Sequence, residues 1–149
     1  MLKLKDAAIN ESLISKDLMK YFTKKELTIK DTDYIVYHTN LKFNDDKFSV
    51  TIDVDGTEYT TIYYKIGTLN DESKAANLAI KLNEKSALSK LVTYYKHPSK
   101  NVIMGKISYL ANKESFNGDY FVSLIERGLY NISIDSKIIL TLPYVDKLL

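Results

Sequence analysis

A run of strict alternation, from Phe48 to Val54, constrains the fold of this chain more than any other stretch. Apolar side chains occupy every second position and polar side chains lie between them, which is the period of a strand with one buried face. The apolar positions are Phe48, Val50, Ile52 and Val54, and the polar positions are Ser49, Thr51 and Asp53. The stretch therefore predicts an antiparallel sheet that packs one face on a core.

The dipeptide Asp55-Gly56 follows this strand and predicts a hairpin turn. A two-residue loop would place Asp53 opposite Glu58, where like charges repel. A three-residue loop, with its glycine in the left-handed conformation, instead places Phe48 opposite Ile62. We prefer this register because it turns the apolar row of the next strand toward the core. That row is Ile62, Tyr64 and Ile66, and the opposite face carries Tyr59, Thr61 and Tyr63.

Helical and strand periods follow one another along the rest of the chain. The predicted helices are residues 9–27, 70–83 and 114–130, and the predicted strands are residues 34–43, 48–54, 59–66, 89–96 and 102–110. This order, α-β-β-β-α-β-β-α, predicts an α+β fold in which an antiparallel sheet packs against helices. A chain of 149 residues is expected to form a single domain.

Two asparagines, Asn77 and Asn83, lie within the predicted middle helix. Asparagine is unfavourable inside a helix because its amide competes for backbone hydrogen bonds. Either both residues face solvent, or one of them bonds to a neighbouring strand.

The element order between residues 12 and 131 resembles that of type III secretion chaperones and of the related YbjN-like bacterial family. The local sequence that carries the resemblance is Asn77–Asn83, which is followed by two strands and a helix. The resemblance implies a small dimeric binding module that accepts an extended peptide or another protein, and it brings no catalytic residues. Secretion chaperones are typically acidic, whereas this chain has a formal net charge of +2.

Residues 132–149 form an apolar C-terminal tail that begins with Ile132 and contains the run from Lys137 to Val145. Such a segment is too apolar to remain in solvent, so we expect a short strand, a helix or an arm that contacts a partner. An arm of this kind favours a homodimer. The tail supplies Ile139, Leu142 and Tyr144 as candidate protein-binding residues.

Composition excludes several classes of protein. The chain contains no cysteine, which excludes disulfides, thiol catalysis and thiolate metal sites. No run of 18 apolar residues predicts a membrane span, and the first residues lack the apolar core of a signal peptide. We therefore expect a cytoplasmic protein that does not enter the membrane.

Catalytic and cofactor motifs are absent from the sequence. His38 and His97 are the only histidines, and neither belongs to a pair with metal-ligand spacing. The start of a calcium loop at Asp53 lacks its final ligand, since the twelfth position is Tyr64. There is no Gly-x-Ser-x-Gly elbow and no glycine-rich phosphate loop. These observations predict a protein that is not an enzyme and has no cofactor or metal.

The 12 tyrosines are the best sequence indication of recognition, because tyrosine is enriched at protein interfaces. We predict a protein-binding module of chaperone, adaptor or inhibitor type, with Tyr59, Thr61 and Tyr63 on its surface. The alternative is a nucleic-acid-binding accessory protein that uses lysines and tyrosines. Its candidate residues are Lys90, Tyr94, Lys96, Lys100 and Lys106. Arg127 is the only arginine, which argues against sequence-specific reading of nucleic acid.

Overall fold

The computed structural model describes residues 1–43, 46–69, 75–85, 91–140 and 145–148. The helices are α1 (Leu2–Ser15), the 3-10 helix η1 (Met19–Tyr21), α2 (Ala75–Lys85) and α3 (Gly118–Leu140). The strands are β1 (Thr23–Ile29), β2 (Thr32–Phe43), β3 (Asp46–Val54), β4 (Tyr59–Leu69), β5 (Thr93–Lys96), β6 (Val102–Leu110) and β7 (Val145–Leu148). The predicted α+β class and element order are confirmed, and β1 and β7 are added to them.

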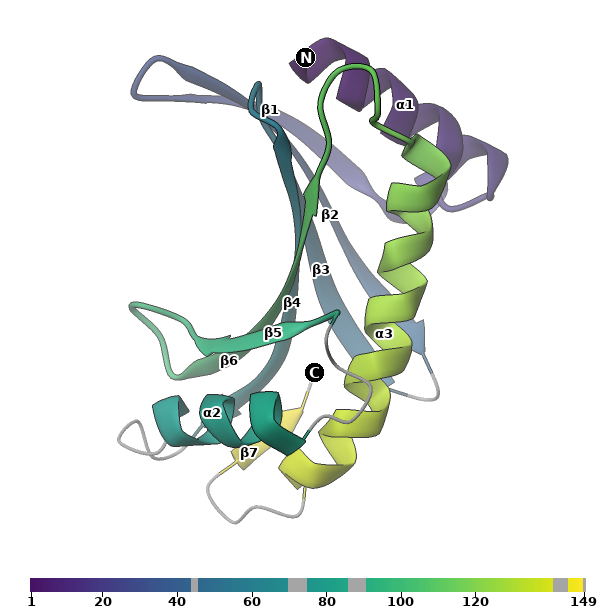
Figure 1. Ribbon diagram of the computed structural model, residues 1–149. Coiled ribbons are helices and arrows are strands. Elements are labelled where there is room, and N and C mark those ends of the chain that lie inside the picture. Colours follow the sequence, from purple (N-terminus) through teal and green to yellow (C-terminus); the bar gives the residue numbers. More distant parts are fainter. Residues whose placement is uncertain (44–45, 70–74, 86–90, 141–144, 149) are drawn as a thin grey trace.

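One antiparallel sheet carries the fold. Its strands run in the order β1-β2-β3-β4-β6-β5, and β7 pairs with the far end of β4. The sheet is strongly curved, with α1 and α3 against its convex face (Figure 1). None of the described helices crosses the concave face; the β5–β6 hairpin borders one end of it, and α2 lies beneath that hairpin, on the side away from the concavity (Figure 1).

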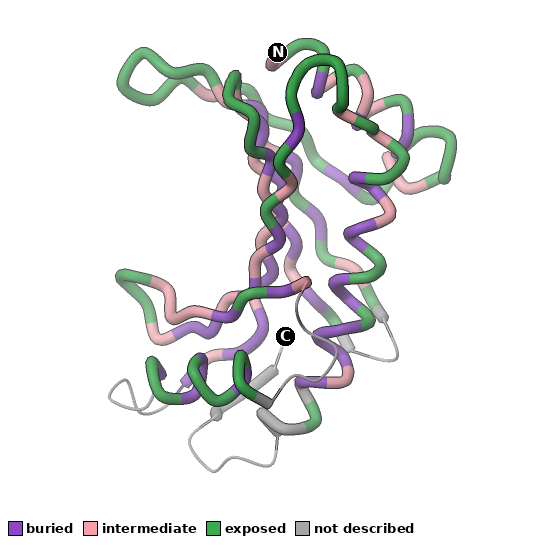
Figure 2. Tube along the Cα trace, in the orientation of Figure 1, coloured by how far each residue is buried: buried purple, intermediate pink, exposed green. Residues whose placement is uncertain are grey.

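The hydrophobic core lies between the sheet and the helices α1 and α3 on its convex face, and Leu78 and Leu82 of α2 extend it at one end. Buried and exposed residues alternate along the strands, and buried residues follow the inner side of α3 (Figure 2). The alternating apolar residues of β3, from Phe48 to Val54, are all fully buried. Helix α3 presents its apolar stripe to them and begins where the Asn117 side chain accepts a hydrogen bond from the backbone N–H of Tyr120, at 2.9 Å. One face of the sheet is therefore committed to the core.

The N-terminal region differs from the prediction of one helix over residues 9–27. Helix α1 ends at Ser15, and Thr23–Ile29 is the edge strand β1. The backbone of Asp17 has a φ of 56°, in the left-handed region that a helix cannot continue through. Because β1 is an edge strand with mostly exposed side chains, its sequence lacks the apolar alternation that predicts a strand.

The β3–β4 hairpin also differs from the prediction. Ile52 lies opposite Ile62, and Val54 lies opposite Thr60, so the predicted pairing of Phe48 with Ile62 is wrong. The loop is longer than three residues, and Gly56 does not have a positive φ. The predicted orientation is nevertheless right, since Ile62, Tyr64 and Ile66 are fully buried.

Side chains explain why this loop is longer. The carboxylate of Asp55 accepts hydrogen bonds from the backbone N–H of Thr57 at 2.8 Å and from its hydroxyl at 2.6 Å. Lys5 of α1, which is fully buried, donates to the carbonyl oxygens of Thr57 at 2.8 Å and Tyr59 at 3.0 Å. The turn is thus held both by local hydrogen bonds and by contacts between residues more than 50 positions apart, and the local sequence does not reveal the latter.

The C-terminal tail contains two of the three expected structures. Residues 132–140 continue α3, and Val145–Leu148 form β7 against β4. Ile132 and Asp135 are buried, which makes this part of α3 a component of the core. The role of the tail as an interface arm stays a prediction.

Candidate binding face

The described helices leave the concave face of the sheet uncovered, and we call it the open face. Strand register places its side chains next to one another: His38 pairs with Thr51, Thr51 with Tyr63, and Tyr63 with Lys106. In the same way Ser49 pairs with Lys65, and Lys65 with Met104. The remaining members of the open face used below are Lys25, Lys47, Asp53, Tyr59, Thr61, Tyr95 and Ser108.

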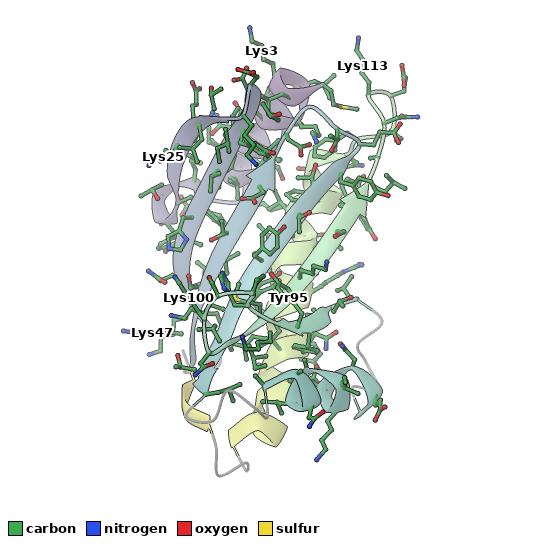
Figure 3. The ribbon with its side chains drawn as sticks, turned by 90° about the vertical axis from the view of Figure 1, so that its left-hand side faces the viewer. Lys3, Lys25, Lys47, Tyr95, Lys100 and Lys113 are labelled. Carbon is green, nitrogen blue, oxygen red and sulfur yellow. The ribbon has the colours of Figure 1, made fainter. Side chains whose placement is uncertain are left out.

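Lysines dominate the charge of this face. Figure 3 looks onto it and shows Lys25, Lys47, Lys100 and Tyr95, with α3 behind the sheet. Lys65 and Lys106 add further ammonium groups from β4 and β6. Among the open-face positions that the structure describes, Asp53 is the carboxylate. The open face therefore carries a local excess of positive charge, although the net charge of the whole chain is only +2.

A half-buried cluster lies toward the β5 edge of the open face. The ammonium group of Lys106 lies over the ring of Tyr95, 5.5 Å from its centroid, which is a cation–π contact. Burial, followed by the neighbouring Tyr63 and Asp53, raises the pKa of Tyr95 to about 12. Burial, and then the charge of Asp55, raises the pKa of Asp53 above its ordinary value. The cluster thus combines aromatic surface, one cation and one carboxyl group, Asp53, whose ionised form is disfavoured by its surroundings.

A pocket of about 200 Å³ lies between the open face and the β5–β6 turn. Strands β3 and β4 line it with Ser49, Thr51, Tyr63 and Lys65, and β6 and the turn contribute His97, Lys100, Val102 and Met104. The turn is held in place where the backbone N–H of His97 donates to the carbonyl of Val102 at 2.9 Å. The pocket is lined by hydroxyls and cations, without a carboxylate.

The predicted protein-binding residues are partly brought together. Tyr59, Thr61 and Tyr63 lie on the open face, as the alternation of β4 predicts, and Tyr59 is 56% exposed. Ile139 lies in α3, far along the chain from these residues. Leu142 and Tyr144 lie outside the described residues.

The predicted nucleic-acid residues fall into different environments. Lys100 and Lys106 border the open face, whereas Lys96 is half-buried and its ammonium group donates to the carbonyl of His97 at 3.1 Å. Lys90 lies outside the described residues.

The structure contradicts the assignment of Tyr94 to a nucleic-acid surface. Tyr94 is only 2% exposed, and its hydroxyl donates a hydrogen bond to the carboxylate of Asp135 in α3. Burial, and then this hydrogen bond, raises the pKa of Tyr94. Because side chains alternate along β5, burial of Tyr94 turns its neighbour Tyr95 to the open face. The stacking residue that the sequence offers is therefore Tyr95.

Sequence reasoning missed Lys25, Lys47, Lys65 and His97 as members of one surface. For Lys47 and Lys65 a signal existed, because each continues the polar alternation of its strand. Lys25 could not be found in this way, since β1 was assigned to a helix. His97 joins the pocket through the turn, whose position over the sheet depends on tertiary structure.

Two kinds of site were sought in the described part of the chain: metal-ligand clusters and membrane-spanning helices. No group of three or more His, Asp or Glu side chains there could hold a metal ion. No described helix has both the length and the apolar character needed to cross a membrane.

Comparison of the chain with protein-family models, curated proteins and solved structures found no match. The chaperone-like resemblance stays a prediction, and the function is argued below from the geometry of the open face.

Proposed function

We propose that this protein is a non-enzymatic binding module that holds an acidic protein partner on the open face. The observation that carries the proposal is the uncovered concave sheet with its lysines, while both long helices lie on the opposite face (Figures 1 and 3). Tyrosine and threonine side chains between the lysines provide contact area and hydrogen bonds of the kind found at interfaces. Complementary charge would steer the partner to this face.

The proposal includes a cytoplasmic location and a homodimer, with chaperone, adaptor or inhibitor activity toward the partner. Native mass spectrometry of the purified chain tests the dimer directly. A mass of one chain at micromolar concentration would remove the dimer and leave the binding face unaffected, since the open face is complete within one chain.

A charge-reversal comparison tests the binding face. Lys25→Glu with Lys65→Glu reverses charge on two strands of the open face, and Lys3→Glu with Lys113→Glu makes the same change in net charge away from it (Figure 3). All four lysines lack an ion pair among the described residues. We would isolate each protein from the native host under low salt and determine the mass of the intact complex.

The proposal predicts that the wild type and the Lys3/Lys113 variant retain a stoichiometric protein partner and that the Lys25/Lys65 variant loses it. Equal retention by both variants would contradict binding at the open face.

A second candidate function is binding of single-stranded nucleic acid, which the cation–π contact of Lys106 with Tyr95 favours. Bases would stack on Tyr95, and the lysines would neutralise phosphates. This function predicts that binding to a fluorescent oligonucleotide weakens steeply with salt and is lost in Tyr95→Ala. The absence of binding at low salt would remove it.

A further inference from the structure

The pocket under the β5–β6 turn has the chemistry of an anion site. Lys65 of β4 and Lys100 of the turn both line it, so two lysines from different elements border the pocket. Neither lysine forms an ion pair within the described ranges. Ser49, Thr51 and Tyr63 line the sheet side of the pocket, and each carries a hydroxyl that can take part in hydrogen bonds; that of Thr51 also lies 3.0 Å from Nδ1 of His38.

His97 adds a donor whose position is fixed by the turn. The backbone N–H of Ser99 donates to Nδ1 of His97 at 3.1 Å. Since Nδ1 accepts this hydrogen bond, the neutral ring carries its proton on Nε2. His97 lines the pocket, and its Nε2–H is the ring donor that this tautomer leaves available.

The size of the pocket restricts the ligand. About 200 Å³ is below the 300–1,000 Å³ typical of sites that enclose a drug-sized molecule, so one compact group fits. A larger cavity of about 590 Å³ between α1 and the start of α3 is lined by Glu11, Glu114 and Asp119, and its carboxylates would repel an anion. Of these two cavities, the smaller one therefore has the lining that suits an anion.

We propose that this pocket binds a single phosphate monoester group, held by Lys65 and Lys100 and oriented by the hydroxyls of the sheet and by His97. The phosphate dianion matches two cations, and its oxygens accept several hydrogen bonds at once. The site does not depend on the protein partner proposed above, because every lining residue belongs to this chain.

The test is a titration of the isotope-labelled chain with inorganic phosphate, followed by NMR at constant ionic strength set with sodium chloride. We expect saturable shifts of the backbone amides around His97–Val102. Lys65→Gln and Lys100→Gln should each raise Kd about tenfold, the effect of losing one charge-assisted hydrogen bond. Lys113→Gln, which removes a lysine outside the open face, should leave Kd unchanged (Figure 3).

O-phosphoserine and adenosine monophosphate, titrated in the same way, identify the source of the phosphate. Tighter binding of O-phosphoserine would assign the site to a phosphorylated side chain, and tighter binding of the nucleotide would assign it to a nucleotide. Shifts that do not saturate, or that saturate equally in the Lys65 and Lys100 variants, would overturn the site. Such a failure would leave the charge-reversal result for the open face unaffected, so the two proposals are tested separately.

Discussion

At the scale of single residues, Asp53 occupies a position that disfavours its ionised form. It lies half-buried on the open face, near Asp55 and among side chains that would bind an acidic partner. Burial first, and Asp55 second, raises its pKa above the ordinary value of 3.8. A carboxyl group whose pKa is raised by folding favours the folded state when protonated and disfavours it when ionised.

Asp53→Asn should therefore increase the free energy of unfolding at pH 7. The wild type is penalised as pH rises through 3.8 toward the raised pKa, and the penalty is constant above it. The gain of the variant should accordingly shrink as pH falls and disappear below 3.8. Urea denaturation of both proteins at a series of pH values measures this difference. A gain that is independent of pH would show that another interaction of Asp53 is responsible.

At Gly128, the close approach of neighbouring side chains requires a residue without a Cβ. A Cβ at this position would lie 2.6 Å from Cζ of Tyr64 and 2.9 Å from Cδ1 of Ile107, both in the core. Gly128→Ala should lower the free energy of unfolding by about 1–3 kcal/mol, the usual cost of overpacking. Gly56→Ala is the control, because a Cβ there meets nothing within 4 Å. Equal stability of the two variants in chemical denaturation would show that α3 can shift to accommodate the methyl group.

At the scale of elements, Asn83 attaches α2 to the edge of the sheet. Its side-chain amide donates to the carbonyl of Tyr94 at 3.0 Å and its oxygen accepts from the backbone N–H of Tyr94 at 2.8 Å, as a neighbouring strand would. Of the two alternatives left open by the sequence, one asparagine bonded to a strand is correct. Asn77, in contrast, is exposed.

Asn83→Ala should lower the free energy of unfolding by about 1–3 kcal/mol, since it leaves two backbone groups of Tyr94 without this partner. Asn77→Ala, on the exposed side of the same helix, should have a small or slightly stabilising effect because alanine favours helix. Hydrogen exchange offers a local measurement, and the amide of Tyr94 should exchange faster in Asn83→Ala alone. Unchanged exchange at Tyr94 would contradict the bridging role.

Lys5 connects α1 with the β3–β4 loop. Burial lowers its pKa and the charge of Asp55, 3.8 Å away, opposes that shift. Lys5→Met should cost about 2 kcal/mol or more, because the carbonyls of Thr57 and Tyr59 lose a charged donor. Lys3→Met, at an exposed position of the same helix, should change stability little. Thermal or chemical denaturation that does not separate the two variants would show that water replaces the ammonium group.

These elements also show how far the sequence could predict the fold. The alternation of apolar and polar residues in β3 and β4 was sufficient to assign their buried face, because the apolar residues of such a strand all point to one side. The register was not predicted, because the local sequence does not show that the loop extends to five residues or that Lys5 of α1 contacts it. β1 was missed since an edge strand with exposed side chains carries little apolar pattern. For the open face, local patterns predicted Tyr59, Thr61 and Tyr63, and Lys100 and Lys106 were named as candidate nucleic-acid residues. The contribution of His97 required the position of the turn over the sheet.

At the scale of the whole molecule, the fold separates charge into two faces. The convex side carries helices with charges of both signs, including Glu11, Asp119 and Arg127. The concave side carries lysines on several strands and, among its described positions, one carboxylate. Several lysines on one concave surface attract an approaching anion jointly. The distribution of charge therefore affects anion binding more than the net charge of +2 does.

This separation predicts different behaviour on a polyanion matrix for two variants of identical net charge. Lys25→Glu with Lys65→Glu should elute from heparin at clearly lower salt than the wild type, because it divides the lysine surface. Lys3→Glu with Lys113→Glu should elute close to the wild type, since its changes lie outside that surface (Figure 3). Circular dichroism would establish that both variants are folded. If both instead shifted equally, the matrix would be sensing net charge, and the open face would have no special role in attracting an acidic partner.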